Sequence, residues 1–296
     1  MIYSQEENTM TNRGRSGGNT IILIQSFMRA LTKKEENVAE VVLSQTENVI
    51  YYSVTDLAEK ADVGETTVLR FCRKIGFKGY QEFKLALAKE LVNPMKSLYQ
   101  EVNDEDSPMA IAKKITATNI QAIQDTFAIL DANQLDMAVK VLLSAQKIHF
   151  YGVGSSGTTT LDAKFKFLRI GIPVDSFYDA HLQAMAATLL SNHDVAVGIS
   201  VSGSTKDTVE SLTLAKQSGA TIICITHYAR SPITKIADIV LLIAAKEGPL
   251  QGGALSSKIA QLHVIDILCT ALSMNMKDKA IEYKEKTAKA VLNKIY

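Results

Sequence analysis

Hydroxyl side chains cluster between Ser200 and Thr208, directly after the apolar run from Val195 to Ile199. That run predicts a buried strand, and residues 207–218 have the spacing of a helix. The hydroxyls therefore fall at the carboxyl end of a strand, where open α/β sheets bind ligands. A helix that starts there adds unpaired N–H groups, so the segment is suited to a bound phosphate. The alternative is an ordinary turn in which these residues only cap the helix.

A second hydroxyl-rich segment follows the apolar run 147–153. It reads Gly154-Ser-Ser-Gly-Thr-Thr-Thr160, and a helical pattern runs from Leu161 to Ile170. We expect both segments to be loops at the same edge of one sheet. They would then face a single crevice and hold one ligand from two sides.

The glycines of the second segment allow another interpretation. Gly152, Gly154 and Gly157 satisfy G-x-G-x-x-G, and Asp175 lies at about the spacing of a ribose-binding acid. A dinucleotide fold, however, does not call for hydroxyls after the following strand. The sequence therefore favours a phosphate site over a dinucleotide site.

The elements that must position these loops alternate regularly. After Lys147, apolar runs that predict strands are followed by helical patterns four times. The pairs are marked by Val153 and Leu161, Val174 and Ala180, Ile199 and Asp207, and Ile225 and Ile233. This alternation predicts an α/β domain, a mainly parallel sheet flanked by helices.

Before the Asn93-Pro94 position, every periodic segment has helical spacing, which predicts an all-α domain. Thr32 begins a capping box, and Ser53 begins another that starts a short helix. Val63 and Gly64 form a tight turn, and a second helix runs from Glu65 to Ile75. A short helix, a tight turn and a second helix make a helix-turn-helix.

On the second helix, Val68, Phe71, Cys72 and Ile75 share an inner face. The residues left to point outward, or to follow the helix, are suited to base edges and phosphates. They are Thr66, Thr67, Arg70, Arg73, Lys74 and Lys78. The basic bias continues through Lys84 and Lys89, whereas the first helix carries Asp56, Glu59 and Asp62. A solvated charged face is the alternative, but the turn between the helices favours DNA.

Composition limits the remaining classes of function. The 296 residues are 47% apolar and carry a net charge of +1, so attraction to nucleic acid must be local. Cys72, Cys224 and Cys269 lie singly in apolar segments and predict core thiols in a cytoplasmic protein. We expect no metal, no cofactor, no signal peptide and no membrane span.

Composition also changes along the chain, at Asn93-Pro94 and at the acidic stretch from Val102 to Pro108. We expect a mobile tail over 1–18, a helix-turn-helix domain over 19–95, a connecting segment over 96–120 and the α/β domain over 121–296. Long helical stretches at Ile111 to Leu130, Ile259 to Met276 and Ala280 to Leu292 are candidates for subunit interfaces or for packing within one chain.

The stretch from Asp56 to Lys84 resembles the helix-turn-helix of the RpiR (MurR) family of bacterial sugar-responsive regulators. The second half is similar to the sugar isomerase (SIS) domain of that family through three motifs. They are Gly152-Val-Gly-Ser-Ser156, Ser200-Val-Ser-Gly-Ser-Thr-Lys-Asp207 and Ser256-Ser-Lys-Ile-Ala-Gln-Leu-His-Val-Ile-Asp266. One departure is Gly64, where the family usually has a side-chain cap, and this puts one phosphate contact in doubt.

The resemblance implies a transcriptional regulator of carbohydrate genes that binds a sugar phosphate and a palindromic double-stranded DNA operator as a homodimer or homotetramer. It assigns the effector to Ser155, Ser156, Ser200, Ser202, Ser204 and Thr205, with His181 and Glu247 near sugar hydroxyls. A phosphosugar isomerase is the alternative, with Glu247, His181 or His263 as acid and base. The helix-turn-helix favours the regulator, which we expect not to be an enzyme.

Overall fold

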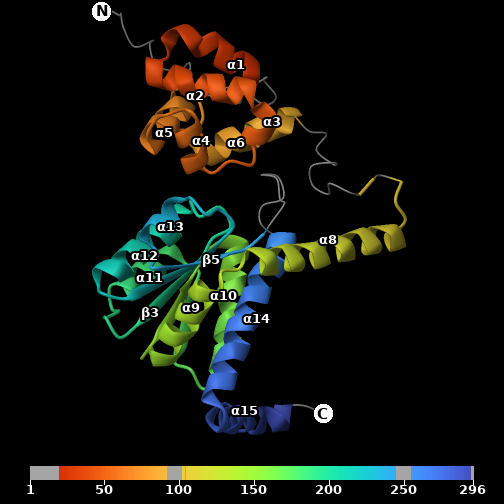
Figure 1. The fold of residues 1–296 in the computed structure, drawn as a ribbon, viewed down its shortest axis with the longest axis vertical. Helices are drawn as coiled ribbons and strands as arrows, with labels where there is room; N and C mark the ends of the chain where they lie inside the picture. Colours follow the sequence, from red (N-terminus) through yellow and green to blue (C-terminus); the bar gives the residue numbers. More distant parts are fainter. Residues whose placement is uncertain (1–19, 92–101, 104, 245–254, 295–296) are drawn as a thin grey trace, which may run out of the picture.

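The computed structural model describes residues 20–91, 102–103, 105–244 and 255–294. A helical amino-terminal domain lies against one end of a larger α/β domain (Figure 1). This agrees with the predicted fold class, an all-α helix-turn-helix domain followed by a mainly parallel α/β domain. The predicted mobile tail, residues 1–18, lies outside the described residues, and the three predicted domain boundaries remain predictions.

Short helices packed around one apolar core form the amino-terminal domain. They are α1 (Thr20–Phe27), η1 (Met28–Ala30), α2 (Lys33–Ser44), α3 (Thr46–Val49), α4 (Val54–Lys60), α5 (Glu65–Lys74) and α6 (Tyr80–Leu91). Both predicted capping boxes are present, at Thr32 before α2 and at Ser53 before α4. Phe71 and Phe83 meet edge to face at the centre of the core, with 5.8 Å between ring centroids.

Five parallel strands form the sheet of the second domain. They are β1 (Ile148–Tyr151), β2 (Val174–Phe177), β3 (Val195–Ile199), β4 (Thr221–Thr226) and β5 (Ile239–Leu242). The strand order is β2-β1-β3-β4-β5, so the chain reverses its direction of winding between β1 and β3. In this topology, ligands bind beyond the carboxyl ends of the strands that flank the reversal.

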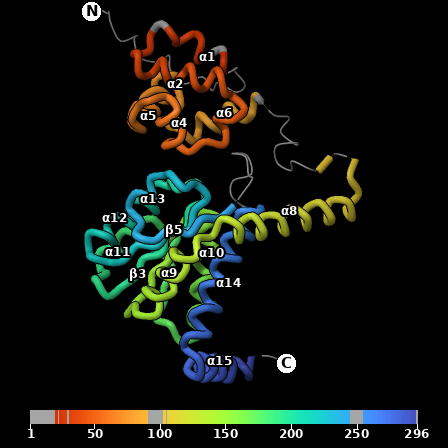
Figure 2. The backbone as a smooth tube through the Cα atoms, in the orientation of Figure 1, coloured from red at the N-terminus to blue at the C-terminus, as the bar shows by residue number. Residues whose placement is uncertain are grey.

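Helices cover both faces of the sheet. They are α8 (Pro108–Ile129), α9 (Ala132–Ser144), α10 (Gly154–Arg169), α11 (Ala180–Ala187), α12 (Lys206–Gln217), α13 (Pro232–Ile236), α14 (Ser256–Met276) and α15 (Asp278–Val291), followed by the short η2 (Leu292–Lys294). One apolar cluster joins α9, α10 and α14 to the sheet, and a second joins α11, α12 and α13 to it. The tube view shows α15 at the end of the α/β domain away from the helical domain (Figure 2).

The long helix α14 is the one described helix with the length and apolarity of a membrane span. Its apolar residues Val264, Ile265, Leu268 and Leu272 are instead fully buried in the core of the α/β domain. Packing within the chain therefore accounts for the apolar residues on this face of the helix. The thiols of Cys72 and Cys224 are also buried in the two domain cores, whereas Cys269 is partly exposed.

The start of α10 corrects one prediction. Gly154 to Thr160 was predicted to be a loop before a helix at Leu161, but the helix already begins at Gly154. Glycine, serine and threonine have weak helix propensity, and burial of Ser156, Thr159 and Thr160 overrides it. The segment 154–160 therefore forms the first two turns of a helix, whereas the other hydroxyl segment, 200–205, does form a loop.

Candidate functional site

The helix α5 presents the side chains that were predicted to contact DNA. Val68, Phe71, Cys72 and Ile75 are buried beneath it, as predicted. Thr66, Arg70, Arg73, Lys74 and Lys78 are exposed, and Thr67 is half-buried. Gly64 is the N-cap of α5 and provides no side-chain cap, so the first N–H groups of the helix are left for another acceptor.

Two lysines of this domain have structural contacts. The Lys74 ammonium lies 2.9 Å from Glu35 Oε2. Burial alone would raise the pKa of Glu35, but hydrogen bonds from Lys74 and from Thr32 outweigh it and lower the pKa. This ion pair joins the end of α5 to the start of α2.

Lys84 was predicted to continue the exposed basic surface that begins on α5, and this prediction is wrong. Its side chain is buried, and its ammonium donates a hydrogen bond to the carbonyl oxygen of Tyr52 at 2.7 Å. Burial lowers the pKa of Lys84 to about 8, although the charge of Asp56 acts in the opposite direction. An internal ammonium with a backbone partner cannot contribute to a DNA-binding surface.

The loop after β3 holds its hydroxyls together at the carboxyl edge of the sheet. The hydroxyls of Ser200 and Thr205 are 3.0 Å apart, and the backbone N–H of Ser204 donates to Ser202 Oγ at 3.2 Å. Thr205 is the N-cap residue of α12, yet its side chain makes no capping hydrogen bond. The first N–H groups of α12 therefore have no side-chain acceptor.

The start of α10 lies at the end of the neighbouring strand β1. Its N-cap residue, Val153, has no side chain that can cap, and Ser155 and Ser156 occupy its first turn. A Cβ at Gly152 would lie 3.2 Å from the backbone oxygen of Ile199, at the end of β3. The missing side chain allows the ends of β1 and β3 to approach closely, so α10 and the loop after β3 border the same edge.

Most other helices of this domain begin differently. Ser107, Asp131 and Asp179 accept hydrogen bonds from the first-turn N–H groups of α8, α9 and α11. The contrast is informative because uncapped N–H groups carry a partial positive charge that binds anions. Helices α14 and α15 also begin without a side-chain cap, but α10 and α12 are the uncapped helices that follow the two strands flanking the reversal of the sheet.

Residues of α14 complete the surroundings of Ser155 and Ser156. Lys258 Nζ donates to the carbonyl oxygen of Ser155 at 2.9 Å and to Thr159 Oγ1 at 2.7 Å. The Gln261 side chain donates to Ser156 Oγ at 3.1 Å and accepts from Thr159 Oγ1 at 2.7 Å. Burial lowers the pKa of Lys258, and the nearby charge of Asp162 opposes this shift.

Sequence reasoning missed Lys258 and Gln261 as site residues. Both belong to the segment Ser256 to Asp266 that carried the family resemblance. The available signal was that Lys258 stands two residues after Ser256, within this motif. Its position beside Ser155 depends on the packing of α14 against α10, which the sequence alone did not specify.

The two residues predicted near sugar hydroxyls have different outcomes. His181 lies in the first turn of α11 and is exposed. Glu247 lies outside the described residues. Gln183, two residues after His181, is fully buried and donates to the carbonyl oxygens of Gly152 and Phe177 at 2.9 and 3.0 Å, which ties the start of α11 to the ends of β1 and β2.

The acidic residue required by the dinucleotide alternative, Asp175, already forms an ion pair. Asp175 lies on β2, and its carboxylate is 2.7 Å from the Lys164 ammonium of α10. Within the described parts of the chain, no group of three or more His, Cys, Asp or Glu side chains is arranged to hold a metal ion. The arrangement presents hydroxyls and N–H groups, which suit an anion held by hydrogen bonds.

Comparison with known proteins agrees with both halves of this description. Residues 18–94 match the model of the helix-turn-helix domain of the rpiR family, and residues 141–271 match the SIS domain model. The transcriptional regulator HexR of Escherichia coli is 36% identical over 86% of this chain and 88% of its own length. HexR of Pseudomonas aeruginosa is also 36% identical, over 86% of this chain and 90% of its own length.

A solved structure extends the agreement to the arrangement of both domains. The NanR protein of Vibrio vulnificus, complexed with ManNAc-6P, matches with a TM-score of 0.82 and 30% identity. The match covers 94% of this chain and 99% of the NanR chain. The present chain belongs to the RpiR family of helix-turn-helix transcriptional regulators with a SIS domain.

Proposed function

We propose that this regulator binds a phosphorylated sugar at the ends of β1 and β3 and changes its hold on a DNA operator in response. The observation that carries the proposal is the pair of uncapped helices, α10 and α12, that begin beside hydroxyls at the reversal of the sheet. Backbone N–H groups and hydroxyl donors together match the oxygens of a phosphate. The complex of NanR with ManNAc-6P supports a phosphorylated sugar as the ligand class.

We assign the phosphate to the side chains and backbone of the hydroxyl loop and of the first turn of α10. These residues are Ser155, Ser156, Ser200, Ser202, Ser204 and Thr205. His181, at the start of α11, and Glu247 are assigned to the sugar hydroxyls. Lys258 fixes the first turn of α10 and places one cation beside it.

The operator is bound by the outward face of α5 and the loop that follows it. Arg70 and Arg73 contact base edges or phosphates, and Thr66, Thr67, Lys74 and Lys78 contribute further polar contacts. One recognition helix reads only a few base pairs, so two copies on a palindromic site are needed for discrimination. We propose that the protein is cytoplasmic and forms a homo-oligomer.

Exposed apolar side chains support an oligomer. On α10, Leu161, Phe165 and Leu168 recur on one face and are 43%, 59% and 54% exposed. Met185, on α11, and Leu189, in the turn that follows it, are 64% and 76% exposed. Exposed apolar side chains that recur on one helix face are typical of a protein interface, and α10 starts beside the proposed ligand site.

A thermal-shift screen of hexose, amino-sugar and pentose phosphates tests the ligand class, because a ligand that binds the folded state raises the melting temperature. We expect a phosphorylated sugar to stabilise the protein and its unphosphorylated parent not to. Equal stabilisation by both sugars would contradict a phosphate site. Conversion of any of these sugars by the purified protein would instead support the isomerase, the function that we propose is absent.

A further inference from the structure

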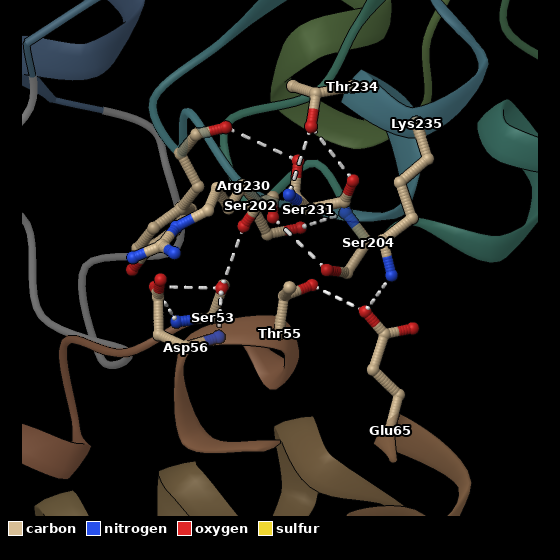
Figure 3. A network of polar contacts seen from close by, with 11 residues as sticks. Ser53, Thr55, Asp56, Glu65, Ser202, Ser204, Arg230, Ser231, Thr234 and Lys235 are labelled. Atoms are coloured by element: carbon tan, nitrogen blue, oxygen red, sulfur yellow. Dashed lines mark hydrogen bonds and ion pairs between the residues drawn. The ribbon is translucent and has the colours of Figure 1, made fainter. Parts of the chain in front are cut away.

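The helix-turn-helix contacts the α/β domain through residues 228–235, which we call the docking segment (Figure 3); it comprises the end of the loop after β4 and most of α13. The Ser53 hydroxyl, at the start of α4, donates to the carbonyl oxygen of Arg230 at 2.9 Å. The Arg230 guanidinium forms an ion pair with Glu59 of α4. The Lys235 ammonium lies 2.6 Å from Glu65 Oε1, at the first residue of α5.

Neighbouring groups reinforce the contact. Thr55 Oγ1 donates to Glu65 Oε1 at 2.6 Å, so the carboxylate is held from both domains. Burial alone would raise the pKa of Glu65, but the hydrogen bonds from Lys235 and Thr55 outweigh it and lower the pKa. The Lys84 ammonium lies 5.7 Å from the centre of the Tyr228 ring, which brings the docking segment against the core of the helical domain.

The docked position covers part of the surface that a duplex would approach, although Arg70 and Arg73 stay exposed. A helix-turn-helix reads DNA with the amino-terminal residues of its second helix in the major groove, while its first helix crosses the backbone. The docking segment contacts the first residue of α5 through Glu65 and the N-cap of α4 through Ser53. These helix ends are therefore against protein at the place where a duplex would approach them.

The docking segment is also joined to the hydroxyl loop. The N–H groups of Ile233 and His227 donate to the carbonyl oxygens of Gly203 and Val201, at 2.9 and 3.1 Å. A Cβ at Gly203, where φ is +60°, would lie 2.1 Å from Ser231 Oγ, and Ser231 is fully buried. No space separates the two segments, so a displacement of the loop must move the docking segment.

We propose that docking of the helix-turn-helix onto residues 228–235 is an autoinhibitory contact, and that the hydroxyl loop controls it through Gly203 and Ser231. The acidic residues Glu59 and Glu65 of the DNA-binding domain occupy the basic residues Arg230 and Lys235 in the docked state. The regulatory part of this proposal rests on the proposed function, whereas the docking itself does not.

The contact between the two domains is weak enough to be reversible. The ion pairs are partly solvated, with the side chains of Arg230 and Glu59 63% and 48% exposed. Pairs of this kind are individually weak, and together they are expected to bias DNA affinity by roughly 5- to 20-fold. A change of this size is within the range by which ligands couple to distant sites.

The test is the double substitution Arg230→Glu with Lys235→Glu in the full chain. We expect it to increase affinity, by about 5- to 20-fold, for the duplex that the unaltered chain selects from a random DNA library. The direction is diagnostic because added negative charge by itself weakens DNA binding. Lys289→Glu, on α15, is the matched control and should not increase affinity.

Small-angle X-ray scattering of the same variants measures docking without DNA. The double substitution should increase the radius of gyration, and adding Glu59→Arg and Glu65→Lys should restore the pairs and the original value. Unchanged scattering together with unchanged or reduced DNA affinity would overturn the autoinhibitory contact. Failure of the unaltered chain to select any DNA would refute the proposed function, while scattering would still decide whether the domains dock.

Control by the hydroxyl loop is tested by Gly203→Ala, after circular dichroism has established that the variant is folded. The added methyl group overlaps Ser231, and alanine is strained at a φ of +60°, so the hydroxyl loop and the docking segment must shift relative to one another. We expect DNA affinity to rise although no residue of the DNA-binding domain has changed. Unchanged DNA affinity and unchanged scattering would refute the coupling, and the Arg230→Glu, Lys235→Glu variant keeps the docking claim testable if Gly203→Ala does not fold.

Discussion

The DNA-binding helix α5 and the hydroxyl site of the α/β domain are both proposed to bind phosphate, but they are built differently. α5 exposes the cations Arg70 and Arg73, whereas the second site places the hydroxyls of Ser200 and Thr205 at the edge of a sheet. Both contain helices without side-chain caps. DNA is a dense line of charges that attracts exposed cations, while a single phosphate is held by donors in fixed positions.

The largest effect is expected on operator binding, from a substitution on α5. Arg70→Ala should abolish operator protection, because each of the two recognition helices loses about 1–3 kcal/mol of binding free energy. Affinity for the sugar phosphate should not change. Footprinting and calorimetry check the two parts, and Lys34→Ala, at an exposed position of α2, is the control. Undiminished protection by Arg70→Ala would mean that α5 does not face DNA as proposed.

The corresponding substitution in the hydroxyl site of the α/β domain is Ser202→Ala. Loss of a hydrogen bond to a charged phosphate should weaken binding by on the order of 1.5–3 kcal/mol. Operator binding without the ligand should remain. Calorimetric titration with the sugar phosphate found by the thermal-shift screen measures the loss. Ser218→Ala, at the opposite end of α12, should bind normally, and equal affinity of both variants would remove Ser202 from the site.

The buried Lys84 separates a structural cation from the exposed ones. Its pKa is lowered to about 8 in the folded state, whereas an unfolded lysine has a pKa of about 10.4. Between these values the unfolded chain binds more protons, so the free energy of unfolding should rise with pH, by up to about 1.4 kcal/mol per pH unit.

Denaturant unfolding between pH 8 and 10 measures this contribution, and Lys84→Met should remove it. Arg70→Ala should keep the same pH dependence because this substitution leaves the buried Lys84 in place. An identical slope for the Lys84→Met variant and the unaltered protein would show that Lys84 is not the titrating group.

The smallest effect is expected for Lys206→Ala. The Lys206 side chain is 81% exposed, and its ammonium is 3.6 Å from Glu210 Oε1. If hydroxyls and N–H groups bind the phosphate, removal of this charge should change ligand affinity by less than about 0.5 kcal/mol. A tenfold loss of ligand affinity, measured by calorimetry, would show that the hydroxyl site also depends on exposed charge.

Local signals were sufficient for most elements. The capping boxes at Thr32 and Ser53 marked the starts of α2 and α4, and the apolar run Val195 to Ile199 coincides with β3. The inner face of α5 followed from the spacing of Val68, Phe71, Cys72 and Ile75. These features depend on neighbours in the sequence, so periodicity and capping chemistry identify them.

Side chains whose surroundings come from distant segments were not predictable in the same way. The early start of α10 depends on burial of Ser156 and Thr159, and the latter contacts Gln261 of α14. Lys84 has the composition of a surface residue but is buried beside Tyr52 and Tyr228. Propensity and charge alone predict the opposite in both cases.

The sequence by itself determined the two domain classes, the recognition helix and the hydroxyl residues, because each is encoded within one short segment. The tertiary structure decided that α10 and α12 begin beside one another, since only the strand order places β1 next to β3. It also decided that Glu59 and Glu65 meet Arg230 and Lys235. Pairs separated by about 170 residues have no local signal, and only the packed chain brings their charges together.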